Sequence, residues 1–443
     1  MLGTGVRQDG KEDRGARIFA LIGLVLFSEG FFNVLVGPAA TADDAAFLRF
    51  VWPPLYLATL VAVLRRRREV AATVRHNWLL VVVVGLCLAS TLWSVDAGTT
   101  ARRSVAVAFT TLFGLWFAVR FDPRERLLLL ARAFAVLAVG SALIALGLPQ
   151  YGVMQEIHPG AWNGAFPQKN KFGAMMVYGA SIFTVIAVTM PSLRRRALAG
   201  AAFCCILVLL STSITSLLAL LLALAVILSA TVILRRPVLA VLAIYGSLMV
   251  AAALTIGLAL DADAVFRMIG RDATMTGRTE IRAPLWERLA TRPWTGFGYG
   301  AFWHDPDGPA WVLRRMLQWD VPSAHNGWVE LWLDIGLGGV VLFGITFLIA
   351  TVRAVAGAAR GIDPETLWTL VFLTLFLLFS ISESSIMRQN NLVWVIYVAA
   401  VATYRWRPEA AQSRPPPRIT WPDRRPDRRP AQEAAGTLPA EPR

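Results

Sequence analysis

The sequence predicts an all-α fold, a polytopic bundle of about twelve transmembrane helices with one large external loop. Of the 443 residues, 56% are hydrophobic, and the mean hydropathy is +0.55, which is well above that of a soluble domain. Many apolar runs reach the roughly 20 residues that are needed to cross the hydrocarbon layer. Arginines collect between alternate pairs of these runs, as they do in the cytoplasmic loops of membrane proteins.

The predicted organisation has five parts. A cytoplasmic N-terminal segment (1–16) precedes nine spans (17–260), a large periplasmic loop (261–326), three further spans (327–405) and a disordered cytoplasmic tail rich in proline and arginine (406–443). In chain order the spans are expected at 17–37, 46–64, 78–94, 104–120, 127–147, 172–190, 197–212, 214–234, 238–260, 327–352, 366–382 and 391–405. The first apolar run has no small-residue cleavage pattern, so it reads as an uncleaved span rather than a signal peptide.

The basic residues set the orientation. With the spans drawn as above, the arginine clusters at 65–68, 120–132, 194–196, 235–236 and 353–360 share one side with both termini, and that side is assigned to the cytoplasm. Most of the net charge of +14 then comes from these cytoplasmic arginine clusters, so it does not indicate a nucleic-acid partner. The three cysteines lie inside apolar runs, which favours buried packing residues over a disulfide or a metal site.

The external loop breaks the orientation rule because it contains arginines. Most of them are matched by an equal number of acidic residues, so pairing on short helices accounts for them. Arg278 stands apart, since it follows Gly277 and opens a helix-like stretch at 279–291 that also carries Arg282 and Arg288. A guanidinium beside the amides of a helix N-terminus suits a diphosphate.

His325 and Asn326 lie where the polar loop meets an apolar, glycine-rich helix. Imidazole is the side chain best suited near neutral pH to accept a proton from an alcohol, although a histidine at a helix start also serves as a cap or packing residue. Lys169 and Lys171, on either side of Asn170, either mark a membrane boundary or supply a second phosphate contact. The loop's tryptophans form an interfacial belt or stack on sugars, and 309–319 is expected to be an interfacial amphipathic helix.

These residues resemble the O-antigen ligase and polymerase superfamily, in particular exopolysaccharide polymerases. His325-Asn326, followed after nine positions by Gly336 and then Gly339, is similar to the ligase signature. The Gly-Arg-Thr-Glu sequence at 277–280, the Arg-Pro-Trp at 292–294 and the Gly-Phe-Gly-Tyr-Gly at 296–300 resemble the family's loop motif. Trp93-Ser94 and Lys169-Asn170 also fit, and the likeness covers nearly all of 17–405.

The resemblance implies a C-type glycosyltransferase fold that acts on undecaprenyl-diphosphate-linked glycan at the periplasmic face of the bacterial inner membrane. It implies an inverting enzyme with no cofactor or metal, with an acceptor glycan or lipid A core as second substrate, and with membrane lipids and other polysaccharide-assembly proteins as partners. His325 takes the place of the general base and Arg278 that of a diphosphate-binding residue. The expected substrate-binding residues are Lys169, Asn170, Arg282, Arg288, Asn326 and Arg388.

One position departs from the family. A serine followed by arginine or lysine is usual at the outer end of a middle span, whereas Ser213 is followed by Ile214. A second cation must then come from Lys169, Lys171, Arg282 or Arg388.

Three other functions stay open. They are ligation of the glycan to lipid A core or to protein, secondary transport, and an inactive role in polysaccharide assembly. Few charges lie within the spans, Glu29 and Glu383 being the main ones, and no repeat relates the two halves, which speaks against a transporter.

Overall fold

The described residues form a helical protein. The structure is a computed structural model that describes residues 5–36, 48–155, 158–233, 246, 278–304, 308–317, 321 and 323–403. Within these ranges the regular elements are helices. One isolated antiparallel β-bridge pairs Val153 with Trp162. The predicted all-α class is therefore confirmed for the part of the chain that is described.

The helix bounds follow the apolar runs closely. Among the described residues, eight longer helices precede the external loop: α1 (Gly5–Phe27), α3 (Leu48–Arg65), α5 (Trp78–Ala89), α6 (Ala97–Arg120), α7 (Pro123–Gly147), α9 (Lys169–Thr189), α10 (Arg194–Leu210) and α11 (Ile214–Ile233). Shorter helices between them are α2 (Phe32–Val36), α4 (Arg67–His76), η1 (Ser90–Leu92), α8 (Pro149–Gly152) and η2 (Pro191–Leu193). The remainder are α14 (Arg278–Thr291), α15 (Trp311–Leu317), α16 (Gly327–Arg360), α17 (Pro364–Ser382) and α18 (Leu392–Thr403).

Several helices are suited to cross a membrane, so the chain is a polytopic membrane protein. In the part of the chain that the structure describes, five are long and apolar enough: α7, the 214–231 part of α11, α9, α16 and α17. A sixth is reached if α4 and the Trp78–Leu92 segment, which meet at 92°, count as one bent span. Twelve spans remain a prediction. Apart from Gly246, the expected span at 238–260 lies outside the described residues, as do the loop before Arg278 and the tail.

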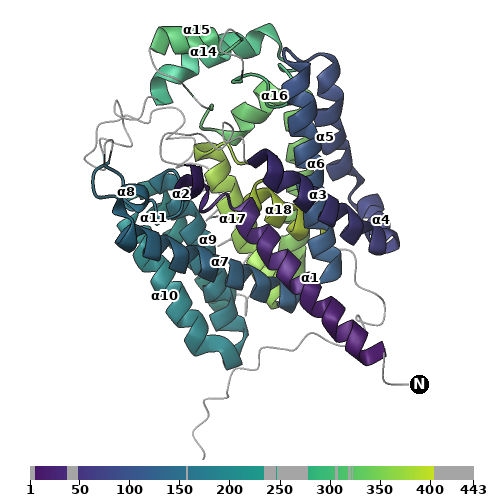
Figure 1. Cartoon of the computed structure of the whole chain (residues 1–443), viewed down its shortest axis with the longest axis vertical. Coiled ribbons are helices and arrows are strands. Elements are labelled where there is room, and N and C mark those ends of the chain that lie inside the picture. Colours follow the sequence, from purple (N-terminus) through teal and green to yellow (C-terminus); the bar gives the residue numbers. More distant parts are fainter. Residues whose placement is uncertain are drawn as a thin grey trace, which may run out of the picture.

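The core of the bundle lies around α6, α9, α17 and α18 (Figure 1). In α9 and α17, 78% of the apolar window is buried, against 33% in α16, so the first two are central and α16 is peripheral. Close approach of α6 and α18 requires Gly114, where a β-carbon would lie 2.8 Å from Val398 Cβ. In Figure 1, α7 and α9 to α11 form one side of the bundle and α3, α5 and α6 the other.

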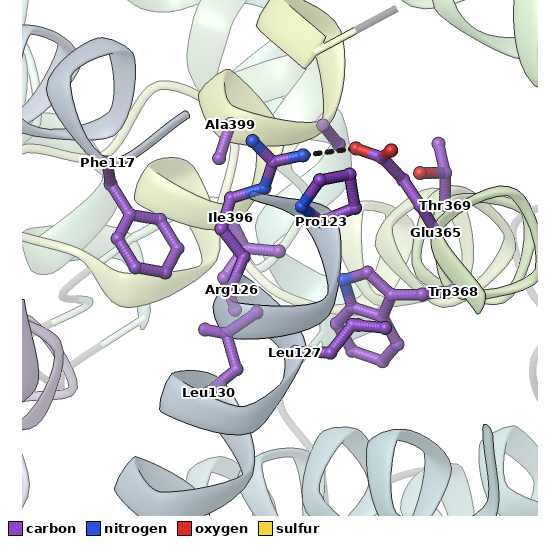
Figure 2. Close-up of a pocket in the computed structure, with 11 residues that line it drawn as sticks. Phe117, Pro123, Arg126, Leu127, Leu130, Glu365, Trp368, Thr369, Ile396 and Ala399 are labelled. Atoms are coloured by element: carbon purple, nitrogen blue, oxygen red, sulfur yellow. Dashed lines mark hydrogen bonds and ion pairs between the residues drawn. The ribbon is translucent and has the colours of Figure 1, made fainter. Parts of the chain in front are cut away.

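Two helices begin at matching Asp-Pro caps. Asp122 accepts a hydrogen bond from the Glu125 amide at 2.8 Å before α7, and Asp363 accepts one from the Thr366 amide at 2.8 Å before α17. Proline at the first helical position costs no hydrogen bond there. These caps place Arg126 and Glu365 so that they form an ion pair (Figure 2).

This ion pair belongs to one end of the bundle, which we call the Arg126 end. Further ion pairs there join Arg17 to Glu125 at 2.5 Å and Arg120 to Asp13. The N-terminal segment, the 120–126 connection and the start of α17, three of the segments expected on the cytoplasmic side, therefore lie together. The cavity beside the Arg126–Glu365 pair measures about 20 Å³, which is enough for a water molecule and far too small for a sugar (Figure 2).

Candidate functional site

A break in α16 receives the loop at 292–304. Ile335 and Gly336 leave helical geometry, and Gly336 takes a left-handed φ of 74°. The backbone amide of Phe297 donates to the Leu333 carbonyl at 2.7 Å, and that of Leu337 donates to the Pro293 carbonyl at 2.8 Å. A β-carbon on Gly336 would lie 2.0 Å from the Trp294 carbonyl oxygen, so only glycine fits at this contact.

The turn at 93–96 holds the same loop from the other side. Trp93 Nε1 donates to the Thr295 carbonyl at 2.8 Å, and the Val95 amide donates to the Phe297 carbonyl at 3.0 Å. Arg103 of α6 donates to the Gly300 carbonyl at 2.7 Å. The sequence motifs at 93–94, 292–300 and 336–339, which are far apart in the chain, therefore meet at one place.

Tyr299 links the loop to the connection between α17 and α18. Its hydroxyl donates to the Met387 carbonyl and lies 3.2 Å from Gln389 Oε1. Burial raises the pKa of the Tyr299 hydroxyl well above its ordinary value, which keeps it a proton donor in these contacts. Arg388, one of the expected substrate-binding residues, is carried by this connection.

His325 lies directly before α16 in an uncommon backbone conformation. Its φ is +49°, in the left-handed region that few side-chain-bearing residues occupy. Asn326 is the N-cap of α16, and its Oδ1 accepts hydrogen bonds from the amides of Trp328 at 3.0 Å and Val329 at 3.2 Å. Asn326 therefore fixes where the helix starts and, with it, where His325 stands.

Glu330 is a positioning residue that the sequence analysis missed. Its carboxylate accepts hydrogen bonds from the Ala324 amide at 2.8 Å, Trp303 Nε1 at 2.8 Å and Ser384 Oγ at 3.2 Å. The first of these fixes the backbone at Ala324, one residue before His325. An acidic residue in the first turn of an apolar helix is the signal that would have found it.

Arg278 is the first residue of α14, close to the helix start expected from the sequence. The helix buries Ile281, Leu285 and Leu289, spaced four residues apart, in a second hydrophobic cluster. That cluster also contains Phe297, Phe302, Leu313, Val321 and Leu333, with Ala324 packed against it. The helix that starts at Arg278 is therefore packed with the residue before His325 at the same end of the bundle (Figure 1).

The other arginines of this part of the chain lie on α14 and on the helix after it. The side chains of Arg278 and Arg282 lie outside the description, whereas Arg288 is half-buried on α14. The amphipathic helix expected at 309–319 is present as α15 over a shorter range. The Arg315 guanidinium lies 4.9 Å from the centre of the Trp311 ring, and Arg314 donates to the Trp303 carbonyl.

Several tryptophans of this end use their ring N–H groups for structure. Trp93 donates to Thr295 as above, Trp332 donates to the Pro293 carbonyl at 2.8 Å, and Trp328 donates to Ser380 Oγ at 3.0 Å. Trp294 is 71% exposed. It is therefore better placed than the other three to stack on a sugar or meet the bilayer interface.

A group of cations gathers at the start of α9. Lys171 forms an ion pair with Glu29, and Arg388 Nη2 lies 3.9 Å from the same Glu29 carboxylate. Lys169 is buried, and its Nζ lies 3.4 Å from Thr212 Oγ1, beside the Ser213-Ile214 position where the family usually has a basic residue. The first turn of α9 also holds Asn170 and no acidic residue. Three of the four cations considered for the missing charge are therefore placed by the structure.

The left-handed residues are concentrated around these contacts. Glu29, His325, Met387 and Asn390 have φ between 49° and 56°, and Gly296, Gly298, Gly300 and Gly336 are also left-handed. We call this region, from the 292–304 loop and His325 to the Glu29 group, the His325 end. Such conformations persist where packing fixes them, and they are frequent at functional sites.

A comparison with known protein families matches a segment of the chain that contains part of this region. Residues 199–344 match the Wzy_C family model, which is described as O-antigen ligase. No curated protein matches the chain significantly. The matched segment, less than half of the chain, contains the 292–304 loop, His325 and the break in α16. It confirms the resemblance to the O-antigen ligase and polymerase superfamily, and with the apolar helices it supports a membrane enzyme of that type.

Proposed function

We propose that the protein is an inverting glycosyltransferase of the inner membrane that transfers or polymerises undecaprenyl-diphosphate-linked glycan on the periplasmic side. The observation that carries the proposal is that the 292–304 loop, which is packed with α14 and Ala324, also contacts through Tyr299 the connection that carries Arg388. These groups come from distant parts of the sequence. A base and several cations held together are what an alcohol nucleophile and a diphosphate leaving group require.

His325 acts as the general base in this proposal. The acceptor hydroxyl oxygen forms a bond to the anomeric carbon, and its proton passes to the imidazole. The bond from that carbon to the diphosphate oxygen breaks, and the electron pair leaves with undecaprenyl diphosphate. Glu330 and Asn326 hold the backbone on both sides of His325, so the imidazole is oriented before the substrate arrives.

The cations hold the diphosphate. Arg278 and Arg282 lie in the first turns of α14, where helix amides add positive potential, and Arg288 lies further along. Lys169, Asn170 and Lys171 form the first turn of α9, and Arg388 reaches the same carboxylate as Lys171. Lys169 supplies the charge that Ile214 lacks, because it lies beside that position. Glu29 holds Lys171 and Arg388 together in the absence of substrate.

Replacement of His325 and Arg278 tests the assignment. In cells that lack the chromosomal gene, we expect His325→Ala to reduce glycan transfer about 10²–10⁴-fold and Arg278→Ala about 10²–10³-fold. Both proteins should reach the membrane at normal levels. His304→Ala and Arg315→Gln are matched controls, since both side chains are exposed residues of the same loop. Near-normal transfer in both test variants would contradict the proposal.

The same strain separates polymerisation from ligation. Single repeat units left on the lipid carrier in the deletion strain indicate a polymerase. Intact long chains left on the carrier indicate a ligase to lipid A core or to protein. Electrophoresis of the carrier-linked glycan distinguishes the two, and unchanged glycan in the deletion strain would argue for transport of another substrate or for an inactive assembly component.

A further inference from the structure

One oxygen of Glu330 joins two segments that are far apart in the sequence. Its Oε2 atom accepts a hydrogen bond from the Ala324 amide at 2.8 Å and another from the Ser384 hydroxyl at 3.2 Å. Ala324 directly precedes His325, whereas Ser384 lies in the connection between α17 and α18 that also carries Arg388. The same atom therefore contacts the backbone beside the proposed base and the segment of a proposed diphosphate-binding residue.

The start of α16 also packs closely against this connection. A β-carbon on Gly327 would lie 2.9 Å from Ile386 Cγ1, and 3.1 Å and 3.3 Å from the carbonyl oxygens of Ser380 and Glu383. The indole of Trp328 donates to Ser380 Oγ at 3.0 Å. Because so little space separates the two segments, a shift of one displaces the other.

The partners described for the Glu330 side chain are all donors. Its second oxygen, Oε1, accepts from Trp303 Nε1 at 2.8 Å, so the two oxygens together satisfy three donors. A carboxamide in this place has a single acceptor oxygen and a donating NH₂ group. With its oxygen toward Ala324 and Ser384, the NH₂ group would oppose Trp303 Nε1, and in the reverse orientation it would oppose the Ala324 amide. Glutamine therefore cannot hold all three contacts.

We infer that Glu330 is a positioning residue that couples the proposed base to the proposed diphosphate site. It fixes the backbone beside His325 relative to the segment that carries Arg388, so that the attacking hydroxyl and the leaving group are held in one geometry. A displacement of about 1 Å in such a geometry lowers a rate about 10²-fold. The inference rests on the proposed function and adds a physical link between its two halves.

Steady-state transfer by the purified full-length protein tests the coupling, with the lipid-linked glycan extracted from the deletion strain as donor. We expect Glu330→Gln to lower kcat about 10²-fold and to raise KM for the donor, since both segments lose their shared acceptor. Ser384→Ala removes only the link to the connection, so it should raise KM about three- to tenfold and lower kcat less. Ser384→Ala also tests the link if Glu330→Gln does not fold.

Two matched variants separate positioning from general packing. Ser380→Ala removes another hydrogen bond between α16 and α17, the one from Trp328, without touching Glu330. Glu287→Gln makes the same chemical change as Glu330→Gln at an exposed position of α14. Both should keep the kcat and KM of wild type. Equal changes in Ser380→Ala and Ser384→Ala would show a general loss of packing and overturn the inference.

The double variant Glu330→Gln/Trp303→Phe tests the hydrogen-bond argument by rescue. Without the indole N–H, the amide oxygen can face Ala324 and Ser384, so kcat should rise above that of Glu330→Gln. No rise would mean that these donors do not set the role of Glu330, which would overturn the inference.

His325→Ala in the same assay separates this inference from the proposed function. If that variant is inactive while Glu330→Gln and Ser384→Ala match wild type, the coupling is wrong and the proposed function stands. If His325→Ala keeps normal transfer, the proposed function fails, and the coupling fails with it.

Discussion

The two ends of the bundle use charged residues in different ways. At the Arg126 end, each of three arginines is matched with one carboxylate: Arg17 with Glu125, Arg120 with Asp13, and Arg126 with Glu365. At the His325 end, Lys171 and Arg388 both lie against the carboxylate of Glu29, and Lys169 lies near the Thr212 hydroxyl. The first end joins its charges one to one, while the second combines its cations with left-handed backbone and helix N-termini.

Under the proposed function, charge stabilises the fold at the Arg126 end and prepares the His325 end for a ligand. A balanced, buried pair between helix caps connects helices and has no spare charge to offer a substrate. Cations that share a carboxylate can exchange it for a phosphate. If this contrast is correct, removing one charge should reduce stability at the Arg126 end and activity at the His325 end.

The largest effect is expected for Arg126→Gln. Arg126 and Glu365 are 8% and 14% exposed, and Arg126 also donates to the Phe121 carbonyl at 3.0 Å. Breaking a buried pair from one side costs on the order of 3–5 kcal/mol, because the remaining charge is buried alone. Thermal unfolding in detergent should show this loss, while the protein that stays folded transfers glycan at the normal rate. The double variant Arg126→Gln/Glu365→Gln should recover part of the stability. An unchanged unfolding temperature in Arg126→Gln would contradict this view.

The converse is expected for Arg388→Gln. The side chain is 46% exposed, so its loss should change the unfolding temperature little. Transfer should fall about 10²–10³-fold, as when one group that stabilises developing charge is removed. Lys171→Met should lower transfer similarly. Glycan transfer per molecule of membrane protein is measured for each variant and compared with wild type, and Arg315→Gln is the control. A stability loss without an activity loss would remove the distinction between the two ends.

The helices could be read from the sequence, whereas most of the junction at the His325 end could not. Apolar runs predict directly where a helix lies, so the sequence places the ends of α9 and α17 to within a few residues. Gly336 and the Gly-rich loop were recognised as motifs, but their mutual contact depends on a helix break that hydropathy does not report. Sequence spacing carries no information on which distant backbone groups pair.

Charged partners were hardest to predict for the same reason. Glu29 and Arg388 come from opposite ends of the chain and were noticed separately, as a buried charge in a span and as a candidate cation. Glu330 was missed because its role depends on the peptide of Ala324 and on Trp303, neither of which is a helical neighbour. Asn326 is predicted to bind substrate, and the structure shows in addition that it caps α16. For Glu29, Arg388 and Glu330, tertiary contacts rather than local pattern define the role.

A smaller effect is expected where the His325 end depends on backbone shape. Gly336→Ala forces a β-carbon against the Trp294 carbonyl and strains a left-handed φ, so it should destabilise the protein by about 1–3 kcal/mol and displace the 292–304 loop. Gly338→Ala is the matched control, because a β-carbon there meets nothing within 4 Å and alanine favours the helix. Unfolding temperature and transfer should both fall in the first variant only. Equal behaviour of the two variants would mean that the break in α16 does not hold the loop.

The smallest effect is expected at the cap of α6. Hydrogen bonds from the Thr99 side chain and amide lower the pKa of Asp96 from its ordinary value. The stabilisation is therefore present above the unfolded-state pKa of about 3.9 and is lost as the pH falls through the lower folded-state value. Asp96→Ala should cost about 1 kcal/mol at neutral pH, and Asp96→Asn much less, since an amide oxygen also caps. As the pH falls below the folded-state pKa, wild type should lose the part of its stability that depends on the charge and approach Asp96→Asn, since a protonated carboxyl caps as an amide does. A difference in unfolding temperature between wild type and Asp96→Ala that is the same at neutral and acidic pH would show that the charge of Asp96 does not stabilise the cap.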